Sequence, residues 1–255
     1  MSWRALVLAA VLAGCAVVPS GMTVPTSTIK PDGDGPFPAV VLLHDCSGLG
    51  PRSSGSPGRW AQELVRRGYV VIIPDSFSTR GLPNGVCTDA SGARGEVGPE
   101  RRAGDAHDAL AFARTLPYVD GARVGVMGGS HGGATTLFAV AQPGFKAGIA
   151  LYPRCGSRAF RPQAPVLILA GELDDWTPAE DCRRLAAAAQ AAGYPVAIKV
   201  YSGAHHSFDS ANPQRFVAAR INPNSPSGRG ATTAGNIEAW RDSILQVEAF
   251  LAKNL

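Results

Sequence analysis

The sequence predicts an α/β fold, with a mostly parallel sheet covered by helices on both faces. Its short apolar runs contain no alternating polar residues, which is typical of strands buried on both faces. Helical patterns separate most of these runs, and parallel neighbours require such crossover segments. With 255 residues, 45% of them hydrophobic, the chain is long enough for one domain with a sizeable core.

Six apolar runs mark the expected strands. In chain order they cover residues 39–43, 69–74, 123–127, 147–151, 166–170 and 196–200. The expected helices cover residues 60–67, 101–116, 131–141, 180–192 and 237–251. The segment 101–116 repeats apolar side chains at helical spacing. The segment 180–192 is rich in alanine and ends at Gly193, a residue type that commonly terminates helices.

The N-terminus has the pattern of a targeting segment. Arg4 precedes an apolar stretch, residues 5–13, that is too short to span a membrane as a helix. It ends in Leu12-Ala13-Gly14-Cys15, which resembles the lipobox of bacterial lipoproteins. This predicts a signal peptide over 1–14, a lipid on Cys15, a tether over 15–28 and the α/β domain over 29–255. A plain secretory signal cut nearby is the alternative, and both interpretations predict export to the periplasm.

The charge distribution argues against a nucleic-acid partner. The net charge is +4, and the 24 basic residues are scattered rather than gathered in a stripe. We expect contact with a membrane only through the lipid anchor. The cysteines form no CxxC pair and show no Cys/His ligand spacing, so no metal site is expected. The oligomeric state is not indicated.

A catalytic motif follows the third expected strand. Gly128-Gly129-Ser130-His131-Gly132 is a G-x-S-x-G sequence between a strand and a helix, the pattern of a nucleophile elbow. Such a turn holds its serine in a strained conformation, and a Cβ two residues to either side would clash. Ser130 is therefore the predicted nucleophile, and a glycine-rich turn without function is the alternative.

A serine hydroxyl needs a base, and the base needs an acid that orients it. His205 and His206 follow the last expected strand, while Asp174 and Asp175 follow the strand before it. The resulting order of serine, aspartate and histidine is that of α/β-hydrolases. Spacing alone leaves open which aspartate and which histidine take part.

These motifs together resemble the dienelactone hydrolase family, over residues 30–255. The matching segments are Pro36–His44, Asp75-Ser76-Phe77, the elbow, Gly171–Asp174 with Pro178, and Tyr201-x-Gly203-Ala204-x-His206-x-Phe208. The resemblance implies an α/β-hydrolase fold, Asp174 as the acid and His206 as the base. Asp175 and His205 remain the alternatives. The best-known members of the family use a cysteine nucleophile, where this chain has Ser130.

The oxyanion hole requires two backbone N–H groups. One is expected from His131, the residue after the nucleophile, and the resemblance implies Cys46 for the other. Arg80 follows the second expected strand and is a candidate for binding a substrate carboxylate, with a structural salt bridge as the alternative.

Four cysteines remain when Cys15 is set aside, and an even number in an exported protein favours disulfides. Cys46 and Cys87 follow two strands that are neighbours in the α/β-hydrolase order. Cys155 and Cys182 follow another neighbouring pair. We therefore expect the bridges Cys46–Cys87 and Cys155–Cys182.

The predicted function is hydrolysis of carboxylic ester or lactone bonds through an acyl-enzyme, without metal or organic cofactor. The alternatives are an amidase or peptidase with the same triad, and a non-catalytic lipoprotein of the cell envelope that binds a ligand. The stretch 210–236 is rich in Pro, Gly, Ser and Asn. We expect it to be a long loop at the mouth of the active site, with a purely solvated loop as the alternative.

Overall fold

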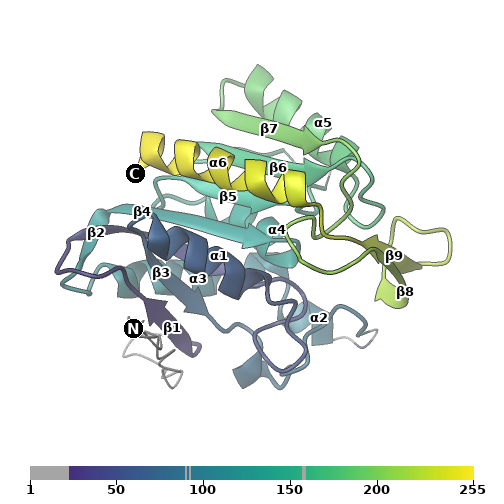
Figure 1. Ribbon diagram of the computed structural model, residues 1–255, viewed down its shortest axis with the longest axis horizontal. Coiled ribbons are helices and arrows are strands. Elements are labelled where there is room, and N and C mark those ends of the chain that lie inside the picture. The colour runs from purple at the N-terminus through teal and green to yellow at the C-terminus, as the bar shows by residue number, and fades with distance from the viewer. Residues whose placement is uncertain (1–22, 90, 92, 157–158) are drawn as a thin grey trace, which may run out of the picture.

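The computed structural model describes residues 23–255 except 90, 92, 157 and 158, so the expected signal peptide and Cys15 lie outside the described residues. A seven-stranded sheet in the order β1-β3-β2-β4-β5-β6-β7 forms the centre of the molecule (Figure 1). Its strands are β1 (Thr26–Ile29), β2 (Phe37–Leu43), β3 (Val70–Pro74), β4 (Val119–Gly129), β5 (Gly148–Leu151), β6 (Val166–Gly171) and β7 (Val196–Tyr201).

All neighbouring strands of this sheet run parallel except β1, which pairs antiparallel with β3. Every residue of β3, β5 and β6 is buried, as expected for strands covered on both faces. The predicted fold class is therefore confirmed. The strand order also places β2 beside β3 and β5 beside β6, the neighbours from which the disulfides were predicted.

Helices cover both faces of the sheet (Figure 1). They are α1 (Ser56–Arg66), α2 (Ala93–Glu96), α3 (Pro99–Ala113), α4 (His131–Ala139), α5 (Ala179–Ala191) and α6 (Ile237–Asn254), with a 3₁₀ turn η1 at Ser78–Arg80. One face packs against α1 and α6, and the centroids of the Trp60 and Trp240 rings on these helices are 4.7 Å apart. The other face packs against α3, α4 and α5 through Leu110, Leu137 and Leu185.

Two segments differ from the sequence-based expectation. The expected tether ends earlier, because Val24 is fully buried and β1 pairs with β3 over residues 26–29. This strand covers an edge of β3 that would otherwise be exposed. The expected loop 210–236 contains a separate two-stranded sheet, formed by β8 (Arg215–Ile221) and β9 (Arg229–Thr233).

The structure contains both predicted disulfides, Cys46–Cys87 and Cys155–Cys182. Disulfides are typical of proteins that fold in an oxidising, exported environment. Among the helices within the described part of the chain, none has the length and apolar composition needed to cross a bilayer.

Candidate active site

Ser130 lies in the sharp turn between β4 and α4, with φ 54° and ψ −113°. The glycines around it are required by the close approach of other backbone segments. A Cβ on Gly132 would lie 2.2 Å from the carbonyl oxygen of Leu43, and a Cβ on Gly128 would lie 2.5 Å from the carbonyl carbon of Gly132. The sequence predicted this steric requirement, and it holds Ser130 at the carboxyl end of the sheet.

The three side chains predicted to form a triad come together. The Ser130 hydroxyl lies 2.9 Å from Nε2 of His206, and Nδ1 of His206 lies 2.7 Å from Oδ2 of Asp174. All three residues are buried, with His206 only 1% exposed. These distances form one continuous hydrogen-bonded chain from carboxylate to hydroxyl.

Asp174 is fixed by the turn that follows β6. Its Oδ1 accepts the backbone N–H groups of Trp176 and Thr177 at 2.9 and 2.8 Å. Its Oδ2 accepts the Thr177 hydroxyl at 2.8 Å in addition to His206. With both oxygens used, the carboxylate can present only one orientation to the imidazole.

The two alternative residues are engaged elsewhere. Asp175 accepts the backbone N–H and the hydroxyl of Thr232 in β9, both at 2.8 Å. Nδ1 of His205 lies 3.0 Å from the carbonyl oxygen of Leu173. Neither side chain has a hydrogen bond with Ser130, and this geometry favours Asp174 and His206 over their neighbours.

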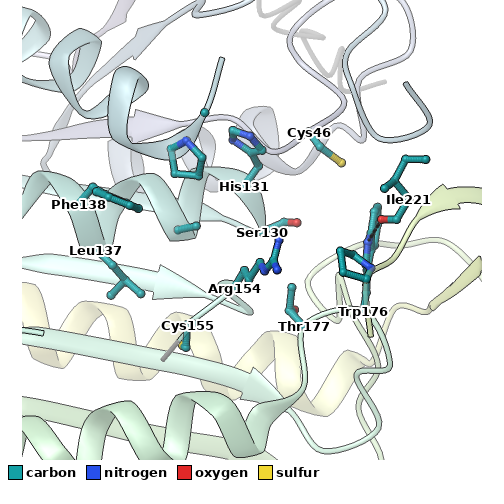
Figure 2. Close-up of a pocket in the computed structure, with 15 residues that line it drawn as sticks. Cys46, Ser130, His131, Leu137, Phe138, Arg154, Cys155, Trp176, Thr177 and Ile221 are labelled. Atoms are coloured by element: carbon teal, nitrogen blue, oxygen red, sulfur yellow. Dashed lines mark hydrogen bonds between the residues drawn. The ribbon is translucent and has the colours of Figure 1, made fainter. Parts of the chain in front are cut away.

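A cavity of about 500 Å³ opens in front of Ser130 (Figure 2). Its wall is mostly apolar, and its lining includes Leu137, Phe138, Trp176, Ile221 and Pro223. Arg154 also lines it, and Figure 2 shows the guanidinium group turned toward the same space as the Ser130 hydroxyl. The Arg154 side chain has no ion-pair partner among the residues that the structure describes.

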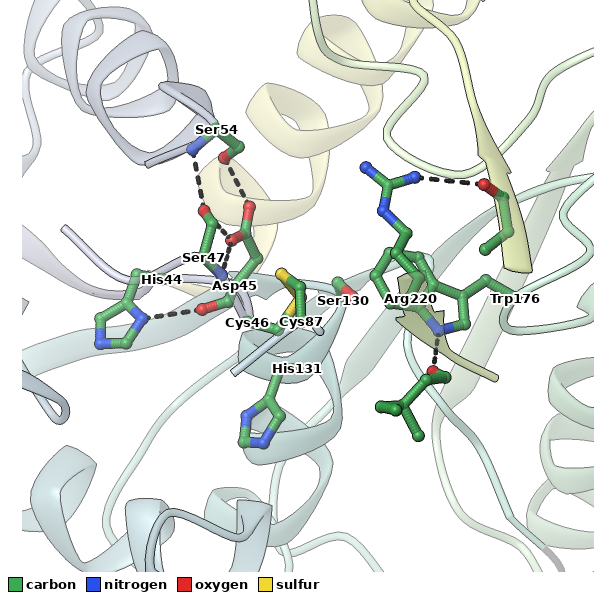
Figure 3. Close-up of a disulfide and its surroundings, with 12 residues drawn as sticks. His44, Asp45, Cys46, Ser47, Ser54, Cys87, Ser130, His131, Trp176 and Arg220 are labelled. Atoms are coloured by element: carbon green, nitrogen blue, oxygen red, sulfur yellow. Dashed lines mark hydrogen bonds between the residues drawn. A yellow bond between two sulfur atoms is a disulfide. The ribbon is translucent and has the colours of Figure 1, made fainter. Parts of the chain in front are cut away.

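The two residues predicted to supply the oxyanion-hole N–H groups, Cys46 and His131, line this cavity together with Ser130. Figure 3 shows the Cys46–Cys87 disulfide beside Ser130. The loop that carries Cys46 is held by Asp45, whose Oδ1 accepts the Ser47 N–H at 2.7 Å and whose Oδ2 accepts the Ser54 hydroxyl at 2.5 Å. Asp45 thus orients the segment on which Cys46 lies.

Arg80 is not among the residues that line this cavity, contrary to the prediction that it binds substrate. Its guanidinium makes two hydrogen bonds of 2.7 Å to the buried carboxylate of Asp105 and one of 2.7 Å to the carbonyl oxygen of Ser76. A bidentate ion pair of this kind occupies the fork of the arginine. The alternative interpretation, a structural salt bridge between η1 and α3, is the one observed.

A buried tyrosine and a buried aspartate, which were not predicted from the sequence, lie next to His206. The Tyr152 ring lies 4.7 Å from the His206 ring, and its hydroxyl donates to Asp209 at 2.8 Å. Asp209 also accepts from Ser56 at 2.6 Å and from Trp60 at 2.8 Å, while burial raises its pKa. Tyr152 has a positive φ of 37°. The sequence could not predict this pair, because its members are 57 residues apart and belong to no motif.

In the described residues, no group of three or more His, Cys, Asp or Glu side chains is arranged to hold a metal ion.

Known proteins share this fold and sequence pattern. The chain is 29% identical over 202 residues to the "Putative carboxymethylenebutenolidase" of Methylorubrum extorquens, covering 72% of this chain and 68% of that protein. The crystal structure titled "Putative Dienelactone Hydrolase" from Klebsiella pneumoniae superposes with a TM-score of 0.71 at 22% identity, covering 90% and 92% of the two chains.

The apo form of Thermogutta terrifontis esterase 2 superposes with a TM-score of 0.63 at 18% identity, covering 93% of this chain and 92% of that one. At such identities the two solved structures support the fold. The sequence model of the dienelactone hydrolase family matches residues 24–246, nearly the whole described chain. The chain therefore belongs to the dienelactone hydrolase family.

Proposed function

We propose that this protein is a serine hydrolase that cleaves carboxylic ester or lactone bonds through an acyl-enzyme. The observation that carries the proposal is the hydrogen-bonded chain Asp174–His206–Ser130 facing a cavity. Membership of a hydrolase family supports the reaction class.

In the first half-reaction, Oγ of Ser130 attacks the carbonyl carbon of the substrate while Nε2 of His206 takes the hydroxyl proton. Asp174 accepts the Nδ1–H of His206, which fixes the tautomer and stabilises the imidazolium. The developing negative oxygen is held by the N–H groups of Cys46 and His131. His206 then protonates the leaving alkoxide, and the ester bond breaks.

In the second half-reaction, water enters in place of the alcohol. His206 takes a proton from this water, which attacks the carbonyl carbon of the acyl-serine. Collapse of the second tetrahedral intermediate returns the proton to Oγ of Ser130 and releases the carboxylic acid. A lactone gives a hydroxy acid, because its alcohol and its acid belong to one molecule.

The cavity favours a compact, mostly apolar substrate. Its wall beside Ser130 carries Leu137 and Phe138 from α4, and Trp176 from the turn after β6. Arg154 adds one positive charge, so this residue rather than Arg80 is placed to meet an anionic substituent.

We further propose that the mature protein starts at Cys15 and is held in the periplasm by a lipid on that residue. The lipobox-like Leu12-Ala13-Gly14-Cys15 and the two disulfides support this location. Metabolic labelling with radioactive palmitate tests it, because Cys15→Ser should abolish incorporation of the label. Incorporation that survives the substitution would contradict the anchor.

The catalytic proposal is tested with a fluorophosphonate probe and a panel of p-nitrophenyl esters, lactones and the corresponding anilides. Ser130→Ala should abolish labelling and lower kcat by about 10⁴-fold or more, since the residual rate comes only from binding and the oxyanion hole. Ser202→Ala is the matched control, because Ser202 is exposed and its hydroxyl donates to Glu172, away from the cavity.

Labelling or ester turnover that survives in Ser130→Ala would overturn the assignment of the nucleophile. Anilide turnover that exceeds ester turnover would favour an amidase. Failure of the wild-type protein to label or to turn over any compound would favour the non-catalytic alternative.

A further inference from the structure

Arg102 is a buried cation that no step above uses. It lies in α3, its side chain is completely shielded from solvent, and no carboxylate within the described part of the chain forms a salt bridge with it. Burial lowers the pKa of Arg102 to about 10, so the guanidinium remains charged at neutral pH. A buried charge without a paired carboxylate is costly, and its contacts therefore need an explanation.

The contacts of Arg102 go to the two sides of the proposed oxyanion hole. Nη2 donates to the carbonyl oxygen of His44 at 2.8 Å, two residues before Cys46. Nη1 lies 2.7 Å from Nδ1 of His131, the residue after the nucleophile. Because arginine has no acceptor, His131 Nδ1 must accept this bond and carries no proton. One side chain thus bonds both donor-bearing segments.

These two segments already touch each other through the elbow. A Cβ on Gly132 would lie 2.7 Å from the carbonyl oxygen of His44, the same oxygen that Arg102 binds. The Arg102 guanidinium carbon also lies 5.0 Å from the centroid of the Phe77 ring, and the Phe77 and His44 rings pack nearly perpendicular with their centroids 4.5 Å apart. The spacing between the two segments is therefore set by packed groups on several sides.

We propose that Arg102 is a positioning residue that holds the N–H groups of Cys46 and His131 in register as an oxyanion hole. The inference rests on the proposed serine hydrolase function. Its physical basis is that two donors on separate segments stabilise one oxyanion only if both lie within hydrogen-bond reach of it. The planar fork of arginine can bond two acceptors at fixed separation, which the ammonium of lysine cannot match.

The test compares Arg102→Lys and Arg102→Met with the wild-type protein in steady-state ester hydrolysis. Removing one oxyanion donor costs about 10²–10³ in kcat, and misplacing the donors should cost about 10–100-fold. KM should change little, because the ground-state carbonyl depends less on these donors than the tetrahedral intermediate does. Binding of phenylboronic acid, which forms a tetrahedral adduct with serine, should weaken by the same factor as kcat.

Arg80→Lys is the matched control. Arg80 also packs against α3, through Asp105, but it bonds the carbonyl oxygen of Ser76 rather than that of His44. This variant should lose stability while keeping kcat and boronate affinity. If Arg102 had only a structural role, Arg102→Lys would likewise lose stability while keeping kcat and boronate affinity. That result would overturn the proposal.

Substitution at His131 keeps the proposal falsifiable if the Arg102 variants fail to fold. His131→Gln retains an acceptor for Arg102, whereas His131→Leu does not, and both leave the backbone N–H in place. The leucine variant should lower kcat and the glutamine variant should restore most of it. Equal kcat in both variants would overturn the proposal.

The fluorophosphonate reaction of each folded variant separates the two hypotheses. Labelling at Ser130 with normal kcat in all Arg102 and His131 variants contradicts the positioning role alone. If the wild-type protein is not labelled, the proposed serine hydrolase function is contradicted.

Discussion

His44 and Arg102 are both fully buried, and the Arg102 guanidinium donates to the backbone carbonyl oxygen of His44, yet the two side chains differ in charge. Arg102 stays charged. Burial, followed by the nearby charge of Arg102, holds the pKa of His44 well below its usual value. His44 is therefore neutral: its Nε2 accepts the Ser76 N–H at 3.2 Å, which leaves the proton on Nδ1 for the carbonyl oxygen of Asp45 at 2.9 Å.

This neutral histidine predicts an acid-sensitive fold. Because the pKa of His44 is lower in the folded chain than the ordinary value of 6.5, the unfolded chain binds a proton between these two values and the folded chain does not. Stability is thus present above about pH 6.5 and falls as pH decreases, by at most about 1.4 kcal/mol per pH unit. Urea denaturation between pH 8 and pH 5 measures this slope.

His44→Asn isolates the contribution of the histidine. At pH 8 the variant reports only lost packing and hydrogen bonding, since His44 is neutral in both states there. Below pH 6.5 the wild-type protein should lose stability faster than the variant. Other groups, such as Asp209 with its raised pKa, are common to both proteins and cancel. Parallel slopes would show that His44 is not the source.

At the scale of elements, the β8–β9 hairpin supports the wall of the cavity in front of Ser130. The indole N–H of Trp176 donates to the carbonyl oxygen of Ile221 at 2.8 Å, and Arg220 lies 4.7 Å above the same indole ring. Trp176 in turn packs against the His206 ring at 4.8 Å. The connection after β8 also reaches the cavity, where Pro223 forms part of the lining.

We predict that this hairpin controls which acyl groups enter. Replacing residues 222–228 with an Asn-Gly turn removes Pro223 and loosens Ile221, which widens the cavity. Discrimination between short and long acyl esters, measured as a ratio of kcat/KM values, should change by about tenfold, because a small change in an apolar pocket shifts transition-state binding by about 1–3 kcal/mol, and about 1.4 kcal/mol is tenfold.

Phe216→Ser provides the control for the hairpin, because Phe216 is in β8 but is 65% exposed. This variant should keep the wild-type preference across the ester series. If the variant with the shortened hairpin also keeps the wild-type preference, the hairpin is a solvated loop without influence on substrate choice. Trp176 would then limit this side of the cavity without the hairpin.

At the scale of the whole molecule, both disulfides lie above the carboxyl edge of the sheet. Cys46–Cys87 ties the loop after β2 to the segment after β3, across 41 residues, and Cys155–Cys182 ties the segment after β5 to α5, across 27 residues. The loop-entropy relation gives about 3.9 and 3.5 kcal/mol of stabilisation, respectively. The two bridges should therefore matter similarly for stability.

Their effects on activity should differ, since Cys46 carries a proposed oxyanion donor. The double variant Cys46→Ala/Cys87→Ala should lower kcat more than Cys155→Ala/Cys182→Ala at a temperature where both are folded. Thermal denaturation and ester kinetics on the same samples give the comparison. Equal losses of kcat would mean that the packing around Asp45 positions the loop without its disulfide.

Local patterns in the sequence carried much of the fold and of the candidate site. Apolar runs marked the central strands β2 to β6 because burial on both faces removes polar residues from a strand, whereas the edge strand β7 carries Lys199 and is only partly buried. The elbow was recognisable because backbone contacts at Gly128 and Gly132 exclude a Cβ. Strand order followed from the fold class, and it was sufficient to choose one disulfide pairing among three.

Contacts between distant segments could not be derived in this way. The polar composition before residue 29 concealed β1, whose pairing depends on the free edge of β3. Arg80 and Arg154 look alike in the sequence, but Asp105 lies within reach of only one of them. The partners of Asp209 are as many as 153 residues away.

Periodicity and local sterics were enough to predict the α/β architecture, the sharp turn at Ser130 and the set of residues from which a triad could form. The packing of distant segments was needed to show which aspartate meets which histidine, which arginine faces the cavity, and where the buried side chains of Arg102 and Asp209 find their partners. These outcomes depend on how buried polar groups satisfy one another after the sheet and helices have packed.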